Sequence, residues 1–233
     1  MIQFVAASVD VPVWGETGRQ HRKTLLQGID LTLAERRVAV IGANGSGKST
    51  LLRLINGLLL PTSGRVLVDG VSTSTDAGEV RRRVGFVFTD PLSQLVMSTP
   101  VDDIELGLRR RVRNKAERKA QALGVLAERG LEHLANQSIY DLSGGERQLV
   151  ALASVLAIEP SIVVADEPTT LLDLRNRDAI CRALLDLPQQ LIYATHDLEF
   201  AAMADRGIVV DSGRVVFDGS ASEAVVQYRK LLA

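Results

Sequence analysis

The 233-residue sequence has little that would fix a fold covalently, because it contains one cysteine, seven prolines and only 4% aromatic residues. Cys181 has no partner for a disulfide within the chain, and its neighbours Leu184 and Leu185 indicate a buried, unreactive thiol. No segment approaches the ~18 to 20 uninterrupted apolar residues of a membrane-spanning helix. The start, Met1–Phe4, lacks the basic region of a signal peptide, so we expect a protein that stays in the cytoplasm and reaches a membrane only through a partner.

The chain also lacks an excess of charge of either sign. Its 27 Lys and Arg residues and 28 Asp and Glu residues give a formal net charge of −1. A nucleic-acid-binding protein usually carries a basic surplus, so we expect no nucleic-acid partner. The 46% hydrophobic and 24% charged content is that of a globular protein, long enough for one large α/β domain with an inserted lobe.

What the chain does contain is a glycine-rich loop, Gly42–Ser49, between the apolar run Val38–Ile41 and the helix-like segment Thr50–Ile55. A glycine-rich turn that ends in Lys-Ser by chance would not need a buried strand before it and a helix after it. The glycines let backbone N–H groups surround a phosphate, and the helix N-terminus favours the same anion. Lys48 would reach the β- and γ-phosphates of a nucleotide, and the Ser49 hydroxyl would bind Mg²⁺. The residues expected at the nucleotide are Gly42, Asn44, Gly45, Ser46, Gly47, Lys48, Ser49 and Thr50.

A second motif, Ser161–Pro168, is a buried strand that ends in two adjacent carboxylates. A lone Asp-Glu pair is often only a solvated acidic turn. Here the strand brings both side chains to the carboxyl edge of a sheet, where open α/β sheets bind ligands. We expect Asp166 to hold Mg²⁺ through a coordinated water, and Glu167 to polarise the water that attacks the γ-phosphate.

The order of the expected strands separates two kinds of sheet. Period-2 patterns and the turn signal Asp69-Gly70 indicate antiparallel strands, and continuous apolar runs indicate parallel strands buried on both faces. Only helix-like sequence lies between Pro91 and Ala157. The antiparallel strands are expected at Ile2–Val11, Ile29–Leu33 and Arg65–Val68, and the parallel strands at Val38–Ile41, Val84–Phe88, Ile162–Ala165 and Leu191–Ala194.

A third motif, Leu142–Gln148, opens a helix, and Ser143 and Glu146 have the spacing of a capping box. A well-capped helix would explain that spacing. It would not explain Gly144 and Gly145, since each glycine costs the helix about 1 kcal/mol. Bare backbone N–H groups that approach an anion closely would explain the glycines.

Together, these three motifs resemble those of the ATP-binding-cassette (ABC) transporter ATPases, and the resemblance covers essentially the whole chain. It implies an α/β fold: a phosphate-loop (RecA-like) core with an antiparallel β-lobe, formed by residues 1–88 and 158–233, and an inserted helical lobe at residues 89–157. It also implies Mg²⁺-dependent hydrolysis of ATP to ADP and phosphate in a head-to-tail dimer, in which Ser143, Gly144 and Gly145 complete the site of the partner subunit.

Other segments extend the resemblance. Thr170–Asp173 is similar to the family's D-loop, of which Asp173 is kept. Tyr193–Asp197 is similar to the switch segment, in which His196 would touch the γ-phosphate and hold Glu167 and the attacking water. Trp14 is the candidate aromatic for stacking on adenine, and it could equally be a packing residue of the β-lobe.

Thr89 departs from the family pattern, which usually places a Gln at the junction between the core and the helical lobe. Three alternatives are open. Thr89 acts through a water, Gln94 substitutes from the loop, or Ser49 and Asp166 hold the metal with weaker coupling to the transport partner.

The segment Asp90–Leu95, followed by Thr99–Ile104, is similar to the energy-coupling-factor (ECF) type of importer ATPases. The Phe88–Pro91 sequence and the short chain look most like the biotin-uptake members. The resemblance implies a homodimer, or a heterodimer with another ABC ATPase. The dimer would lie on the cytoplasmic face of the membrane, bound to a transmembrane scaffold protein and a substrate-capturing membrane protein. The cargo would be a vitamin, with biotin favoured, or a transition-metal ion. The alternatives are a non-transport ABC ATPase and a regulatory module that senses ATP without hydrolysing it.

Overall fold

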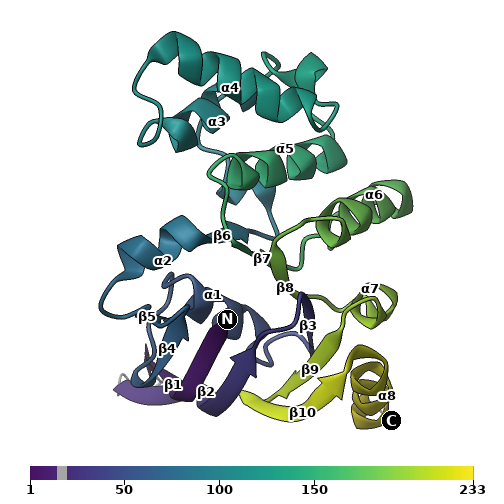
Figure 1. Cartoon of the computed structure of the whole chain (residues 1–233). Coiled ribbons are helices and arrows are strands. Elements are labelled where there is room, and N and C mark those ends of the chain that lie inside the picture. The colour runs from purple at the N-terminus through teal and green to yellow at the C-terminus, as the bar shows by residue number, and fades with distance from the viewer. Residues whose placement is uncertain (15–19, 233) are drawn as a thin grey trace.

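The computed structural model describes residues 1–14 and 20–232. In it, the strand that precedes the phosphate loop lies in the interior of a six-stranded sheet (Figure 1). All neighbouring strands are parallel except the edge pair β9 and β10. In spatial order the strands are β10 (Arg214–Ser220), β9 (Arg206–Asp211), β3 (Arg37–Ile41), β8 (Gln190–Ala194), β7 (Ile162–Asp166) and β6 (Val84–Val87). The four parallel strands expected from apolar runs are thereby confirmed.

The apolar run of β3 is continuous because both faces of this sheet are covered. Val38 and Val40 pack into a cluster with helix α1 (Lys48–Ile55) and the second sheet. Ala39 and Ile41 point to the opposite face and pack into another cluster with later helices. This alternation is what a strand with a period of two residues requires when it is buried on both sides.

The second sheet is antiparallel and has four strands. Ile29, Leu31 and Leu33 are buried as their period-2 pattern predicts, and the turn at Asp69 and Gly70 has positive φ at both residues. Positive φ at both central residues is the hairpin geometry that the Asp-Gly pair favours. In spatial order the strands are β2 (Gln20–Leu33), β1 (Ile2–Trp14), β4 (Ser63–Val68) and β5 (Val71–Ser72).

Helices cover the sheets unequally (Figure 1). Helix α1 contributes to the apolar cluster shared by the two sheets, and four later helices contribute to the cluster on the other face of the parallel sheet. Those four are α5 (Gly144–Leu156), α6 (Leu174–Leu185), α7 (Leu198–Ala202) and α8 (Ala221–Leu232). The remaining helix of the core, α2 (Ala77–Arg83), leads into β6.

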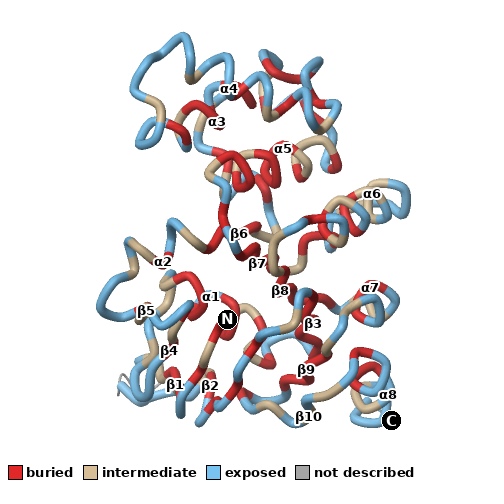
Figure 2. The backbone as a smooth tube through the Cα atoms, viewed as in Figure 1, coloured by how far each residue is buried: buried red, intermediate tan, exposed pale blue. Residues whose placement is uncertain are grey.

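A helical lobe lies between β6 and β7. Residues 88–161, all of which are described, contain no strand, as expected. The lobe has an apolar cluster of its own, which runs from Leu95 to Ala157 and includes the inner side of α5 (Figure 2). Its elements are η1 (Pro91–Ser93), α3 (Pro100–Leu108), α4 (Lys115–Ala127), η2 (Glu132–Leu134) and α5.

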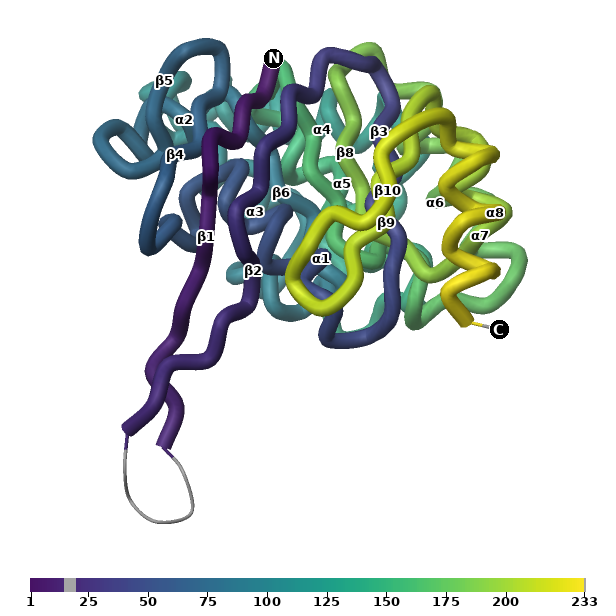
Figure 3. The backbone as a smooth tube through the Cα atoms, turned by 90° about the horizontal axis from the view of Figure 1, so that it is seen from below, coloured from purple at the N-terminus to yellow at the C-terminus, as the bar shows by residue number. Residues whose placement is uncertain are grey.

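The sequence did not predict β9 and β10. The apolar run of β9 is only three residues long, Ile208–Val210, and β10 is an edge strand whose residues are all at least partly exposed. Strands β1 and β2 are also longer than expected, and their outer halves form a ribbon that projects from the molecule (Figure 3). Within residues 1–14 and 20–232, none of the helices has the length and apolar character of a membrane crossing.

Candidate functional site

The phosphate loop forms a cradle at the carboxyl end of β3. Gly47 has a φ of 114°, and a Cβ atom there would lie 2.9 Å from Leu26 Cδ2 and 3.0 Å from Leu25 O, so only glycine fits. The Lys48 ammonium folds back over the loop and donates hydrogen bonds to Gly42 O (2.9 Å) and Ala43 O (3.1 Å). The Ser46 hydroxyl is buried and has no hydrogen-bond partner among the described residues.

Ser49 and Asp166 meet across the two motifs. The Ser49 hydroxyl donates a 2.8 Å hydrogen bond to Asp166 Oδ1. Burial raises the pKa of the Asp166 carboxyl, and the Ser49 hydroxyl and the Arg53 guanidinium, 3.9 Å from Oδ2, partly oppose that rise. A hydroxyl beside a carboxylate is an oxygen donor set that suits Mg²⁺. The described residues contain no group of three or more His, Cys, Asp or Glu side chains that could hold a metal ion.

Glu167 lies between Lys48 and His196. Its backbone is in the left-handed region (φ 51°), a conformation that is uncommon for a non-glycine residue. Its Oε1 atom is 3.5 Å from Lys48 Nζ, and its Oε2 atom is 2.7 Å from His196 Nδ1 and accepts a 3.1 Å hydrogen bond from Thr170 Oγ1. Oε1 is buried without a hydrogen-bond partner in the described structure. The carboxylate is therefore fixed by hydrogen bonds through Oε2, and its Oε1 atom faces the Lys48 ammonium.

Lys48, Ser49 and Glu167 line one cavity of about 270 Å³. It opens in front of the phosphate loop and has Glu167 on its inner wall. Its lining residues are Lys23, Leu25, Asn44, Gly45, Gly47, Lys48, Ser49, Thr50 and Glu167. Lys23 and Leu25 were not among the expected site residues, since their place at the loop depends on the register of β2 and no local motif marks them.

The third motif lies elsewhere. Ser143 and Glu146 form the expected capping box at the start of α5. Asp173 caps α6 by accepting a hydrogen bond from Asn176 N (2.9 Å). A Cβ atom on Gly145 would lie 2.2 Å from Asn176 Oδ1 and 2.8 Å from its Cβ. Gly145 is thus required for the close packing of α5 on α6, a reason for glycine that is independent of an approaching anion. None of Ser143, Gly144, Gly145 and Asp173 lines the cavity at the phosphate loop.

The junction at Thr89 bonds directly to the second motif. The Thr89 hydroxyl donates a 2.7 Å hydrogen bond to Asp166 O. The Gln94 amide accepts from Phe88 N (3.2 Å) and donates to Ala151 O on α5 (2.8 Å), so it is engaged in holding its own loop to the helical lobe. The structure therefore gives Gln94 a positioning role at the lobe.

Trp14 is not brought to the other expected site residues. It ends strand β1, pairs with Gln20 and is 75% exposed, so the alternative of a packing residue in the β-lobe is wrong. It is absent from the lining of the cavity at the phosphate loop. Stacking on adenine remains a prediction that this geometry does not favour.

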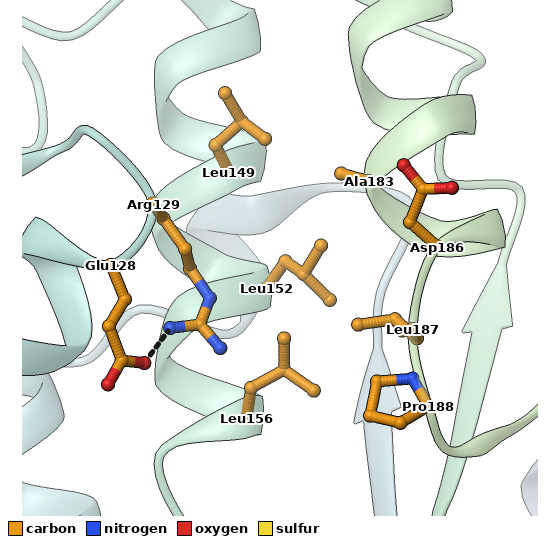
Figure 4. Close-up of a pocket in the computed structure, with 9 residues that line it drawn as sticks. All are labelled: Glu128, Arg129, Leu149, Leu152, Leu156, Ala183, Asp186, Leu187 and Pro188. Carbon is orange, nitrogen blue, oxygen red and sulfur yellow. Dashed lines mark hydrogen bonds and ion pairs between the residues drawn. The ribbon is translucent and has the colours of Figure 1, made fainter.

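A cavity of about 330 Å³ lies apart from these motifs, between α5 and the end of α6 (Figure 4). Leu149, Leu152 and Leu156 form its apolar floor, and the ion pair Glu128–Arg129 (3.4 Å) lies at one edge. It contains no residue of the three motifs. Volume alone therefore does not identify the site.

Fold and site define a phosphate-loop nucleotide-binding protein of the α/β class with an inserted helical lobe. A sequence profile of the family described as "ABC transporter" matches residues 26–170. The chain belongs to the ABC transporter family, and it is an ATPase of that family whose activity is coupled to transport.

Three similar proteins agree with this assignment. The chain is 46% identical over 211 residues to the biotin transport ATP-binding protein BioM of Rhizobium etli, which covers 91% of this chain and 94% of that protein. It is 41% identical over 203 residues to the ECF transporter ATP-binding protein EcfA1 of Halalkalibacterium halodurans, covering 84% and 72%. It superimposes on the ATP-binding cassette MJ0796, a dimer bound to ADP and phosphate, with a TM-score of 0.84, 31% identity and coverage of 95% and 99%. The resemblance to ECF ATPases and to biotin-uptake members is thus confirmed.

Proposed function

We propose that this chain is the Mg²⁺-dependent ATPase subunit that energises an ECF importer of a vitamin, with biotin as the favoured cargo. The cargo rests on the similarity to BioM and EcfA1. The observation that carries the chemistry is the position of Glu167, whose carboxylate faces Lys48 on one side and His196 on the other within the cavity of the phosphate loop.

The phosphate loop holds the triphosphate in this proposal. Its backbone N–H groups and the N-terminus of α1 favour the β-phosphate. Lys48, which now donates to two carbonyls of its own loop, exchanges them for phosphate oxygens. The residues assigned to phosphate binding are Gly42, Asn44, Gly45, Ser46, Gly47, Lys48, Ser49 and Thr50.

The magnesium site is assigned to Ser49 and Asp166, whose oxygens already lie 2.8 Å apart. A Mg²⁺ ion, when bound, neutralises the charge that develops on the phosphate oxygens. Ser49 would exchange its hydrogen bond to Asp166 for the metal, and Asp166 would hold a coordinated water, as carboxylates at Mg²⁺ sites often do.

Glu167 is assigned as the general base and His196 as the residue that orients it. The Oε1 atom of Glu167, which faces Lys48 and accepts no hydrogen bond from the described residues, takes a proton from the water that attacks the γ-phosphate, while Oε2 is fixed by Thr170 and His196. The fixed Oε2 atom sets the direction of Oε1.

Ser143, Gly144, Gly145 and Asp173 are assigned to the nucleotide of a partner subunit in a homodimer or heterodimer. They lie outside the cavity of their own chain, and the similar cassette MJ0796 is a dimer. We place the dimer on the cytoplasmic face of the membrane, against a transmembrane scaffold protein and a substrate-capturing protein. The assignment keeps residues 89–157 as the helical lobe and residues 1–88 and 158–233 as the core with its β-lobe.

The test measures phosphate release and transport together. The purified chain should release phosphate from ATP only when Mg²⁺ is present, and Lys48→Ala should abolish this. Vesicles that contain the chain with its membrane partners should accumulate biotin only when ATP is supplied. An ATP-dependent uptake of another vitamin or of a transition-metal ion would correct the cargo, whereas ATP binding without turnover would contradict the enzymatic assignment.

A further inference from the structure

Strands β1 and β2 continue beyond the core as a two-stranded ribbon (Figure 3). Its register is regular from Asp10, which pairs with Thr24, to Trp14, which pairs with Gln20. The register shift just before it, between Val9 and Asp10, leaves Leu25 unpaired. In a regular ribbon, successive residues point to opposite faces, so the register decides which side chains lie on the same face as the phosphate loop.

One face of the ribbon is marked by a hydrogen bond. The Thr24 hydroxyl donates to Asp10 Oδ1 at 2.7 Å, so these two side chains share a face. Alternation from this pair assigns the remaining pairs to the two faces. The face of Asp10 and Thr24 also carries Pro12, Arg22, Trp14 and Gln20, and the opposite face carries Val11, Lys23, Val13 and His21.

The face of Lys23 is the one that lies toward the phosphate loop. Val9, on the same face as Val11, is buried in the core, and Leu26, its partner, lies against Gly47. Lys23 and Leu25 line the 270 Å³ cavity together with the phosphate-loop residues, whereas Trp14 does not. The tryptophan is thus separated from the cavity both by distance along the ribbon and by the direction of its side chain.

We infer that Lys23, and not Trp14, is the residue of this ribbon that contacts the nucleotide, through its triphosphate. This inference rests on the proposed function. Lys23 lines the cavity together with Asn44, Gly45 and Gly47 of the phosphate loop, so its ammonium would act there as a second cation besides Lys48. A lysine is a compact point charge that binds phosphate oxygens without reading the base. Lys23 should therefore strengthen the binding of any polyphosphate.

The ribbon offers a matched control. Arg22 is the neighbouring cation on the same strand, and the register places it on the opposite face with Trp14. Substituting Arg22 removes the same formal charge from the same ribbon. If only the charge of the ribbon matters, substituting Lys23 and substituting Arg22 should weaken ligand binding equally. If Lys23 contacts the ligand, only its substitution should weaken binding.

The experiment measures dissociation constants of MgATP and of inorganic tripolyphosphate by titration calorimetry. Lys23→Ala should weaken both ligands about tenfold, the expected effect of losing a hydrogen bond to a charged group. Lys23→Arg should bind within about threefold of the wild type, and Arg22→Ala and Trp14→Ala within about twofold. Lys23→Gln, which keeps most of the apolar stem, replaces Lys23→Ala if that variant unfolds.

Three outcomes would overturn the inference. The first is equal binding by Lys23→Ala and the wild type. The second is a loss confined to MgATP, which would place Lys23 at the nucleoside. The third is a larger loss in Trp14→Ala than in Lys23→Ala, together with quenching of the emission of this single tryptophan by ATP but not by tripolyphosphate. Lys48→Ala distinguishes a failure of this inference from a failure of the proposed function. A wild-type chain that binds no MgATP, or binds it no more tightly than Lys48→Ala does, would contradict the proposed function itself.

Discussion

At the scale of single residues, Glu167 shows how the backbone prepares a side chain for chemistry. A left-handed φ at a non-glycine residue is unfavourable by about 1 to 2 kcal/mol. The hydrogen bond from Glu167 N to Ala194 O (3.0 Å) and the contact with His196 hold it in place. The strand β7 thus ends in a turn that directs its carboxylate back toward Lys48 instead of into solvent.

Glu167→Gln should therefore keep the shape of the site and remove the proton acceptor. We expect the rate of hydrolysis to fall about 10²- to 10⁴-fold, or about 3 to 5 kcal/mol in activation free energy, while ATP binding persists. Steady-state phosphate release and calorimetric ATP binding measure the two effects. Glu199→Gln, a change at an exposed carboxylate, is the control. Turnover at the wild-type rate in Glu167→Gln would show that another group is the base.

Thr89→Ala should have a much smaller effect. Its hydroxyl bonds to the backbone of Asp166 and not to a side chain of the site, and a neutral hydrogen bond contributes about 0.5 to 1.5 kcal/mol. Basal hydrolysis by the isolated protein should thus change by no more than about tenfold. If Thr89→Ala reduces hydrolysis as severely as Glu167→Gln does, Thr89 belongs to the catalytic groups and its assignment to the junction is wrong.

The sequence predicted residues whose chemistry is local. The phosphate loop, the Ser49–Asp166 pair and the neighbourhood of Glu167 and His196 each follow a buried strand, and parallel strands bring their ends together. Lys23 and Trp14 could not be placed in this way. Their faces depend on the register shift between Val9 and Asp10, which moves side chains by one position and has no signal in composition.

At the scale of elements, β6 and α5 pack with almost no space between them. A Cβ atom on Gly85 would lie 2.3 Å from Val155 Cγ1 and 3.1 Å from Pro160 Cγ. Gly85 lies in a strand interior, where glycine is usually unfavourable, so its place in β6 reflects this close approach. The contact fixes α5, and with it the third motif, relative to the parallel sheet.

Gly85→Ala should destabilise the protein by about 1 to 3 kcal/mol because the added methyl group overpacks this contact. Val155→Ala removes the clashing methyl group, so the double variant should lose less stability than the sum of the two single changes. Urea unfolding measures these free energies. Gly124→Ala is the control, since nothing lies within 4 Å of a Cβ atom there, and in the interior of α4 it should stabilise by about 0.5 to 1 kcal/mol. Additive losses at Gly85 and Val155 would contradict the proposed contact.

A second element, the loop after η1, is held by one buried carboxylate. Asp103 accepts hydrogen bonds from Val96 N (2.8 Å), Met97 N (3.1 Å) and Ser154 Oγ on α5 (2.9 Å). With the bond from Gln94 to Ala151, this attaches the loop to α5 at two places. The loop should therefore move with the helical lobe, the part that we expect to transmit the nucleotide state to the membrane partner.

Asp103→Asn should loosen the loop without touching the catalytic groups, because an amide oxygen replaces two carboxylate oxygens. We expect faster hydrogen exchange at Val96 and Met97, unchanged basal hydrolysis and less biotin imported per ATP in vesicles. The neighbouring Asp102→Asn is the control, since among residues 1–14 and 20–232 that carboxylate accepts a hydrogen bond from Thr99 alone, at the surface. If both variants import the same amount of biotin per ATP hydrolysed, the transmission through this loop does not depend on Asp103.

Strand prediction at this scale succeeded where an apolar run was long and failed at the edge. β3, β7 and β8 each carry an unbroken apolar run, as a parallel strand buried on both faces requires. β9 begins with Arg206 and Gly207, and β10 alternates exposed and half-exposed residues, so neither carries the pattern that separates a strand from a loop.

At the scale of the whole molecule, the residues that we assign to the nucleotide lie in two separate places. The cavity with Lys48 and Glu167 lies at the end of the parallel sheet, whereas Ser143 and Gly145 lie at the start of α5, where it packs on α6. One chain therefore presents a nucleotide cavity and a separate glycine-containing helix start. A head-to-tail pair of chains would bring each of these to the other, which predicts that the isolated subunit is incomplete as an enzyme.

Hydrolysis should accordingly depend on association. The ATPase rate of the isolated protein should rise more than linearly with its concentration until dimers saturate. Ser143→Arg should abolish hydrolysis, because the large arginine side chain blocks the approach of this helix start to the partner's nucleotide. MgATP should still bind at Lys48 with nearly the wild-type dissociation constant. Ser222→Arg adds the same charge at an exposed position of α8 and should change neither property. Phosphate release at several protein concentrations, alongside sizing of the same samples, measures the dependence. A specific activity that stays constant down to concentrations where only monomer is present would mean that one chain holds a complete site, and the division of the machinery between two subunits would be refuted.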